Sequence, residues 1–200
     1  MKNIDDVFRV RDASECGPLI CICHGDCWSN NFLFHYNDAG VANDNRIVDW
    51  QILTPENPGR DIYEFLATST SPEVRKECGS ELLDHYVTTF MSALSKLGVS
   101  LEDEGIDRQL ILSEIKKKML FGLFMGLALL PIIMDKTMTA KIEELGNDEG
   151  AAKSLRDGDR NTDEMFSEAQ STVTLDIILS NKPLCHRVIG LVEEIRAALQ

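Results

Sequence analysis

The chain carries the stretch HGDCWSNN at residues 24–31 and, after a hydrophilic turn, the stretch IVDW at residues 47–50. Three polar side chains stand out in these stretches: Asp26, Asn31 and Asp49. Carboxylate and amide oxygens suit a hard cation such as Mg²⁺, which keeps several waters and takes few protein ligands. The two stretches therefore predict a tight loop and a returning strand that bring a carboxylate and two oxygen ligands together.

The residues between the two stretches predict a short β-hairpin. Residues 32–34 (FLF) are typical of a short buried strand, and residues 46–48 (RIV) are typical of the strand that returns. Residues 35–40 between them are rich in Asn, Asp and Gly, which tolerate the backbone conformations of tight turns. Such a hairpin brings Asp49 back beside Asn31.

This order of polar residues matches a phosphoryl-transfer site. Kinases use one Asp to accept the proton of the substrate hydroxyl, and an Asn five residues later together with a second Asp on the next hairpin to hold Mg²⁺. The spacing therefore predicts that Asp26 is the catalytic base and that Asn31 and Asp49 are the metal ligands.

The motif is specific enough to resemble a known family. His24-Gly25-Asp26 with Trp28 and Asn31, followed by VDWQ at residues 48–51, is similar to the choline-kinase-like and ecdysteroid-kinase-like (CHK) branch of the protein-kinase-like superfamily, whose relatives include the aminoglycoside phosphotransferases. The family more often has Phe where this chain has Trp50, a change that keeps an aromatic anchor. The resemblance implies transfer of a phosphoryl group from ATP, with Mg²⁺, to a hydroxyl of a small molecule such as a steroid or a choline-like alcohol.

The resemblance also implies supporting roles around the catalytic loop. In related kinases an Asp at the start of the following helix bonds the backbone of this loop, which implies that role for Asp61. From the sequence alone Asp61 is also a good helix cap, because residues 57–59 (NPG) break structure before it. His24 supports the loop or is simply a packed histidine, and Trp28 is a packing anchor or a substrate contact.

The rest of the chain predicts an α+β fold that is predominantly helical. We expect the catalytic loop and hairpin at residues 17–52 and a helical remainder at 61–200, within one compact unit. Helices are expected at residues 82–97, 111–134, 162–180 and 183–199, with an exposed loop at 143–163. In the last helix one core-facing stripe is expected from Val188, Ile189, Leu191, Val192, Ile195 and Leu199.

The kinase template also needs a nucleotide-covering loop and a phosphate-pairing Lys, both N-terminal to the catalytic loop. Only residues 1–23 precede His24 in this sequence. We therefore expect residues 1–200 to form the C-terminal lobe of a protein-kinase-like fold without its N-terminal nucleotide-binding lobe. The cofactor-binding residues of that lobe and the oligomeric state cannot be assigned from the sequence.

The apolar run at residues 119–134 has two interpretations. It follows three lysines at 116–118 and could anchor the chain to a membrane, but its 16 residues are fewer than the roughly 20 that a spanning helix needs. A buried core helix, with Gly122 and Gly126 allowing close packing, is therefore favoured over a membrane span.

The net charge and the spacing of the cysteines exclude some classes of function. A net charge of −13 argues against a nucleic-acid partner, which would need a basic face. The six cysteines show no paired C-x-x-C spacing and no signal peptide precedes them, so reduced thiols and a cytoplasmic location are favoured over a disulfide or zinc role. Three functions stay open: a small-molecule kinase, a catalytically inactive pseudokinase or scaffold that kept the large lobe, and a membrane-anchored protein.

Overall fold

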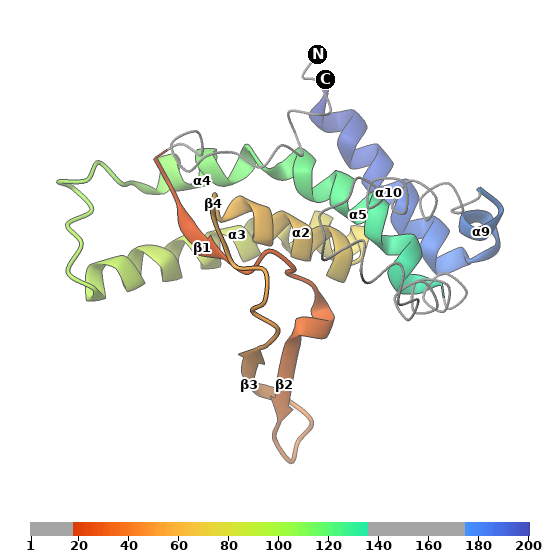
Figure 1. Cartoon of the computed structure of the whole chain (residues 1–200), viewed down its shortest axis with the longest axis horizontal. Helices are drawn as coiled ribbons and strands as arrows, with labels where there is room; N and C mark the ends of the chain where they lie inside the picture. The colour runs from red at the N-terminus through yellow and green to blue at the C-terminus, as the bar shows by residue number, and fades with distance from the viewer. Residues whose placement is uncertain (1–17, 136–174) are drawn as a thin grey trace, which may run out of the picture. The chain divides into compact units, whose positions relative to one another are not determined.

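The computed structural model describes residues 18–135 and 175–200. Helices dominate these residues, and two small two-stranded sheets accompany them (Figure 1), which confirms the predicted predominance of helix. The elements are β1 (Cys21–Cys23), η2 (Ser29–Asn31), β2 (Phe32–Tyr36), β3 (Ala42–Ile47), β4 (Thr54–Glu56), α2 (Gly59–Ser69), α3 (Pro72–Lys96), α4 (Arg108–Lys116), α5 (Met119–Met134), α9 (Leu175–Ser180) and α10 (Lys182–Ala198).

The chain divides into two compact units, Met1–Met125 and Gly126–Gln200, with the boundary inside α5. The sequence predicted a single unit. In the second unit α10 packs against α9, and the Asn181 amide nitrogen donates to the Met134 carbonyl at 3.1 Å. An apolar stripe on a helix predicts that its face will be buried, but it does not predict which element packs against it. The division into two units could therefore not be predicted from the sequence.

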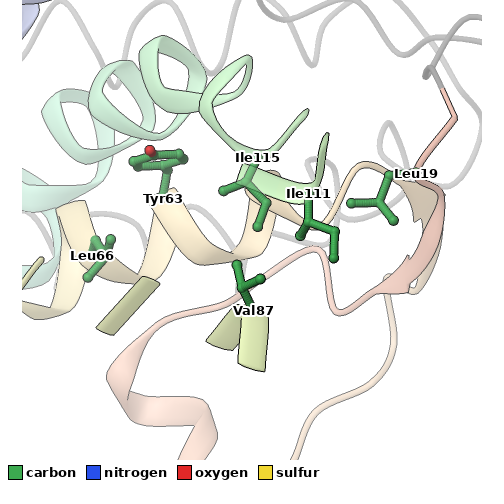
Figure 2. Close-up of a cluster of buried hydrophobic side chains, with 6 residues drawn as sticks. All are labelled: Leu19, Tyr63, Leu66, Val87, Ile111 and Ile115. Carbon is green, nitrogen blue, oxygen red and sulfur yellow. The ribbon is translucent and has the colours of Figure 1, made fainter. Parts of the chain in front are cut away.

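The core of the first unit lies where α2, α3 and α4 meet. Figure 2 shows Tyr63 and Leu66 on α2, Val87 on α3, and Ile111 and Ile115 on α4, with Leu19 from the segment before β1. Val87, Ile111 and Ile115 are fully buried. Burying each such aliphatic side chain stabilises the fold by roughly 1.5–3 kcal/mol, so this cluster fixes α2, which carries residues of the candidate site.

Side-chain caps explain where several helices begin. The Ser71 hydroxyl accepts from the Val74 amide ahead of α3, and the Asp107 carboxylate accepts from the Leu110 amide at 2.7 Å ahead of α4. Each cap satisfies one of the amides that the first helical turn leaves unpaired. At its other end α3 stops before Gly98, whose φ of 84° is left-handed. The predicted end of this helix is confirmed, and the apolar stripe at 82–97 forms the second part of a helix that begins at Pro72.

The predicted helix at 111–134 is wrong as one element. It is two helices, α4 and α5, which are separated at Lys117 and Lys118. The amide of Lys117 donates to Glu114 O and that of Lys118 to Ile115 O, so the last turn of α4 tightens and the axis turns. No residue of α5 is fully exposed, as expected of a core helix. A Cβ added at Gly122 would lie 2.3 Å from Tyr63 Cβ, so the predicted close packing at Gly122 is confirmed.

Among the helices that the structure describes, none is by itself long and apolar enough to cross a membrane. The bent pair α4 and α5 meets the length and composition criterion only when both helices are counted together.

Two further expectations differ from the structure. The strand at 32–34 forms within β2, but Leu33 and Phe34 are 56% and 49% exposed rather than buried, and β3 is the only strand of the described chain that pairs with β2. The core-facing stripe predicted for the last helix is only partly buried. On α10 the buried apolar side chains are Leu184 and Leu191, while Ile189, Val192 and Leu199 are exposed. The loop expected at 143–163 and the first part of the helix expected at 162–180 lie outside the described residues.

Candidate active site

The loop at residues 24–28 directly follows β1, one of the two strands of the β1–β4 sheet. β1 pairs antiparallel with β4, with Cys23 opposite Thr54. Gly25 has a left-handed φ of 86°, and a Cβ added there would lie 2.4 Å from the Ile52 carbonyl oxygen. Only glycine fits such a position, because it combines a positive φ with a close backbone approach. The glycine of the HGD motif therefore lets the chain turn tightly in front of Asp26.

Asp61 holds the start of this loop. Its Oδ2 accepts from the His24 amide at 2.6 Å, and its Oδ1 accepts from the Gly25 amide at 3.1 Å. Asp61 lies in the first turn of α2, where the helix dipole favours a negative charge. The further prediction that Asp61 also caps α2 is wrong: the helix begins after Pro58, and the Gly59 amide donates to Asn57 Oδ1 at 2.8 Å.

His24 is buried, with 4% of its surface exposed, and both of its ring nitrogens have partners. Nε2 lies 2.8 Å from the Val48 carbonyl oxygen, which can only accept, so Nε2 carries the proton. Nδ1 is then free to accept from the Asp26 amide at 3.3 Å. The ring also contacts Trp50, with centroids 4.9 Å apart. His24 thus connects the backbone of Asp26 to the residue before Asp49.

Asp26 and Asn31 are in direct contact. The amide nitrogen of Asn31 donates to the Asp26 carbonyl oxygen at 2.8 Å and to Asp26 Oδ2 at 3.0 Å. These two acceptors fix the orientation of the amide, because an amide oxygen could not donate to them. No group among the described residues donates to Asn31 Oδ1, which is therefore available to a cation. Oδ2 of Asp26 is thus occupied by Asn31, whereas Oδ1 has no hydrogen bond among the described residues.

The structure brings the backbones of Asn31 and Asp49 close together. In the hairpin, Phe32 of β2 is opposite Ile47 of β3, and one step further the Val48 amide donates to the Asn31 carbonyl oxygen at 3.0 Å. Asp49 follows directly and is exposed.

The conformation of Asp49 is unusual. Its φ is 67°, which no other non-glycine residue of the described chain matches. A non-glycine residue with positive φ carries some strain, and such positions cluster at functional sites. Within the described ranges, the carboxylate of Asp49 has no hydrogen bond or ion pair, so it too is available to a cation.

These oxygens fit a magnesium site of the open kind. The described residues contain no group of three or more His, Cys, Asp or Glu side chains that could hold a metal. Mg²⁺ keeps several waters and is often bound through one or two protein oxygens together with substrate phosphates. Asn31 Oδ1 and the Asp49 carboxylate are a donor set of that size and chemistry.

Trp28 is partly buried and directly precedes η2. Its carbonyl oxygen accepts from the Asn31 amide at 3.0 Å, which forms the 3-10 turn that leads to Asn31. The Ser29 amide donates to the Ser69 hydroxyl at 2.8 Å, which ties this turn to the end of α2. Whether the indole of Trp28 contacts a substrate stays a prediction.

The sequence did not single out Glu64. Its surface is 1% exposed, its Oε2 has no hydrogen-bond partner among the residues that the structure describes, and burial raises its pKa to about 8. Arg60 opposes this rise, whereas the carboxylates of Asp61 and Asp26 add to it. One feature of the sequence could have indicated that Glu64 is buried: it is the single charged residue in the otherwise apolar or aromatic segment IYEFLA at 62–67.

Burial disfavours the thiolate form of the cysteines near the loop. The five described cysteines carry free thiols, and burial raises the pKa of Cys23 and raises that of Cys27 to about 12. Nearby carboxylates, Asp61 first among them, add to the rise at both positions. Because the thiolate is the nucleophile and the metal ligand, neither thiol is suited to either role.

Comparison with known families agrees with the resemblance of the motif. Residues 1–99 match the profile of the ecdysteroid kinase-like family. No curated protein and no solved structure matches the chain. The matched residues include the HGD loop, the hairpin and α2, so through this half of its sequence the chain belongs to the ecdysteroid kinase-like family.

Proposed function

We propose that this chain is the catalytic part of an ATP-dependent phosphotransferase that phosphorylates a hydroxyl of a small molecule. Asp26 accepts the proton of the acceptor hydroxyl while the hydroxyl oxygen attacks the γ-phosphorus of ATP. The bond from that phosphorus to the β,γ-bridging oxygen breaks, and ADP leaves. Asn31 and Asp49 would hold Mg²⁺, which when bound would supply positive charge against the charge that develops on the phosphates. Asp61, His24 and Trp28 keep the loop in shape.

One observation carries this proposal: the Asn31 amide nitrogen donates to both the carbonyl and the carboxylate of Asp26. The contact aims the amide oxygen of Asn31 away from Asp26 and fixes one carboxylate oxygen of the base. A proton acceptor and a cation ligand then lie side by side in a set geometry, as in-line phosphoryl transfer requires. The membership of residues 1–99 in a kinase-like family supports the same reaction class.

We further propose that residues 1–200 provide the C-terminal lobe of the enzyme. The template assigns the phosphate-covering loop and the phosphate-pairing Lys to a small lobe, which this proposal places outside residues 1–200. Asp26, Asn31 and Asp49 alone then bind Mg-ATP weakly.

The test is transfer of labelled γ-phosphate from ATP to a panel of steroid and choline-like alcohols, by residues 1–200 joined to an N-terminal kinase lobe. We expect Asp26→Asn to lower kcat by about 100-fold or more with little change in the KM for Mg-ATP. Asp49→Ala should lower kcat and raise that KM, because it removes a metal ligand.

The matched control is Asp44→Asn, which changes an exposed carboxylate on β3 that pairs with Arg46 and accepts from the Asn45 amide. It should leave both constants unchanged. Equal and mild effects of Asp26→Asn and Asp49→Ala would contradict the assigned roles. Binding of Mg-ATP without transfer to any alcohol would support the inactive pseudokinase instead.

A further inference from the structure

Asn57 lies at the junction of three elements. It directly follows β4 and precedes α2 by two residues, and its surface is 1% exposed. Its side-chain nitrogen donates to the Glu114 carbonyl oxygen near the end of α4 at 3.0 Å. Its side-chain oxygen accepts from the Gly59 amide at the start of α2 at 2.8 Å. One amide group therefore connects the end of α4 to the start of α2.

The backbone of Asn57 extends this junction to the catalytic loop. Its carbonyl oxygen accepts from the Arg60 amide at 3.0 Å and from the thiol of Cys23 at 3.5 Å. Cys23 is the last residue of β1 and directly precedes His24. The beginning of the loop is thus held on one side by Asn57 and on the other by Asp61.

A buried ion pair fixes the same junction. The Nζ of Lys118, directly before α5, lies 3.1 Å from Glu56 Oε1, with 15% and 7% of the two side chains exposed. The same Glu56 oxygen accepts from the Asn57 amide at 2.9 Å. A Cβ added at Gly59 would lie 2.3 Å from the Ile115 carbonyl oxygen, so α2 and α4 meet there without room for a side chain.

We propose that Asn57 is a positioning residue of the catalytic loop: by joining α4 to the first turn of α2, it sets where Asp61 meets the His24 and Gly25 amides. Asp61 is only four residues further along the chain, in the same helical turn as Gly59. A shift of this turn moves the carboxylate relative to two amides that it must meet at 2.6 and 3.1 Å. The consequence for catalysis rests on the proposed function, but the coupling of Asn57 to the loop does not.

The test compares amide hydrogen exchange, measured by NMR, in residues 1–200 and in Asn57→Asp. Aspartate has nearly the same shape and keeps an oxygen for the Gly59 amide, but it cannot donate to Glu114. We expect the protection of the His24 and Gly25 amides to fall at least tenfold more than that of the Phe90 amide in α3. A uniform fall, or no change at His24 and Gly25, would overturn the proposal.

Val87→Ala is the control for general destabilisation, because it leaves a cavity in the core without touching Asn57 or the loop. It should lower protection at Gly25 and Phe90 by the same factor. Asn57→Ser, whose shorter hydroxyl cannot reach Glu114, is a second variant should the aspartate not fold. It should produce the same selective loss at His24 and Gly25.

A double-mutant cycle shows whether Asn57 acts through Asp61. In an Asp61→Ala background the two amides have already lost their acceptor, so Asn57→Asp should add no selective loss at His24 and Gly25. Additive losses would mean that Asn57 acts on the loop by another route, and would overturn the proposed path.

The effect of Asn57→Asp on catalysis is measured separately, with residues 1–200 joined to an N-terminal kinase lobe. There Asn57→Asp should lower kcat about tenfold and leave the KM for Mg-ATP within twofold, because it disturbs the base and not the nucleotide. Equal changes in both constants would overturn the positioning role. An absence of any phosphoryl transfer by the unsubstituted enzyme would instead contradict the proposed function and leave the exchange result standing.

Discussion

The carboxylate of Asp61 accepts a hydrogen bond from the amide of His24 at 2.6 Å, although 37 residues separate them in the chain. A second bond, to the Gly25 amide, uses the other carboxylate oxygen. Hydrogen bonds to charged groups are stronger than neutral ones, and a buried donor left without its acceptor is costly. This contact therefore stabilises the first unit as well as shaping the loop.

We expect Asp61→Ala to lower the free energy of unfolding of the first unit by about 3 kcal/mol, because two amides lose a charged acceptor. Urea unfolding followed by fluorescence of Trp28 and Trp50, which both lie near the loop, measures this change. Asp44→Ala is the control, since its ion pair with Arg46 is exposed and contributes little. Similar losses for the two variants would contradict the importance of the Asp61 contacts.

Glu64 should make stability depend on pH. Burial raises its pKa from 4.5 to about 8 in the folded state, so the folded protein holds this proton more tightly than the unfolded chain does. The stabilising effect of the proton is complete below about pH 4.5 and is lost as the pH rises toward 8. Glu64→Gln, which cannot ionise, should therefore be no more stable than the parent at pH 4.5 and about 3 kcal/mol more stable at pH 7.

Urea unfolding of both proteins between pH 4.5 and pH 8 tests this dependence. The control is Thr68→Val, one turn further along α2, which removes a buried hydroxyl that donates to the Glu64 carbonyl oxygen. Its effect on stability should not vary with pH. A difference between Glu64→Gln and the parent that stays constant across the range would show that Glu64 does not titrate there.

Two glycines with positive φ should respond differently to alanine. Gly25 and Gly40 have φ of 86° and 73°, so alanine is strained at both by about 1–2 kcal/mol. Only at Gly25 would the new Cβ also meet backbone, 2.4 Å from Ile52 O, whereas nothing lies within 4 Å at Gly40. We expect Gly25→Ala to lower the midpoint of thermal unfolding clearly more than Gly40→Ala does. Equal shifts would mean that the loop does not pass close to Ile52.

The sequence was sufficient for the local features of the site. The spacing of Asp26 and Asn31 and the turn residues before β3 are local signals, and the predicted order of loop, strand, turn and returning strand is present in the structure. The catalytic and metal-binding roles of Asp26, Asn31 and Asp49 stay predictions, since geometry alone does not test them.

Features that depend on contacts between residues far apart in the chain could not be predicted from the sequence. The break at Lys117 and Lys118 lies in residues that are good helix formers, and it is accompanied there by bonds to Glu56 and Glu114. The burial of Glu64 contradicts its polarity, and the exposure of Phe34 contradicts its hydrophobicity. In each case the tertiary environment of the residue decided its structure or burial, against the intrinsic preference of that residue type. A single sequence does not show which residues contact one another in the fold.

The cation site proposed for Asn31 and Asp49 is most directly tested with Mn²⁺, a paramagnetic substitute for Mg²⁺, added to residues 1–200 and followed by NMR. If the two side chains hold a cation, the amide signals of Asn31 and Asp49 should broaden at the lowest Mn²⁺ concentrations. Asp49→Asn should abolish this selectivity, and Asp44→Asn should not. Broadening that begins instead at the acidic turn of residues 102–104, or that is the same in Asp49→Asn, would contradict a metal site at the hairpin.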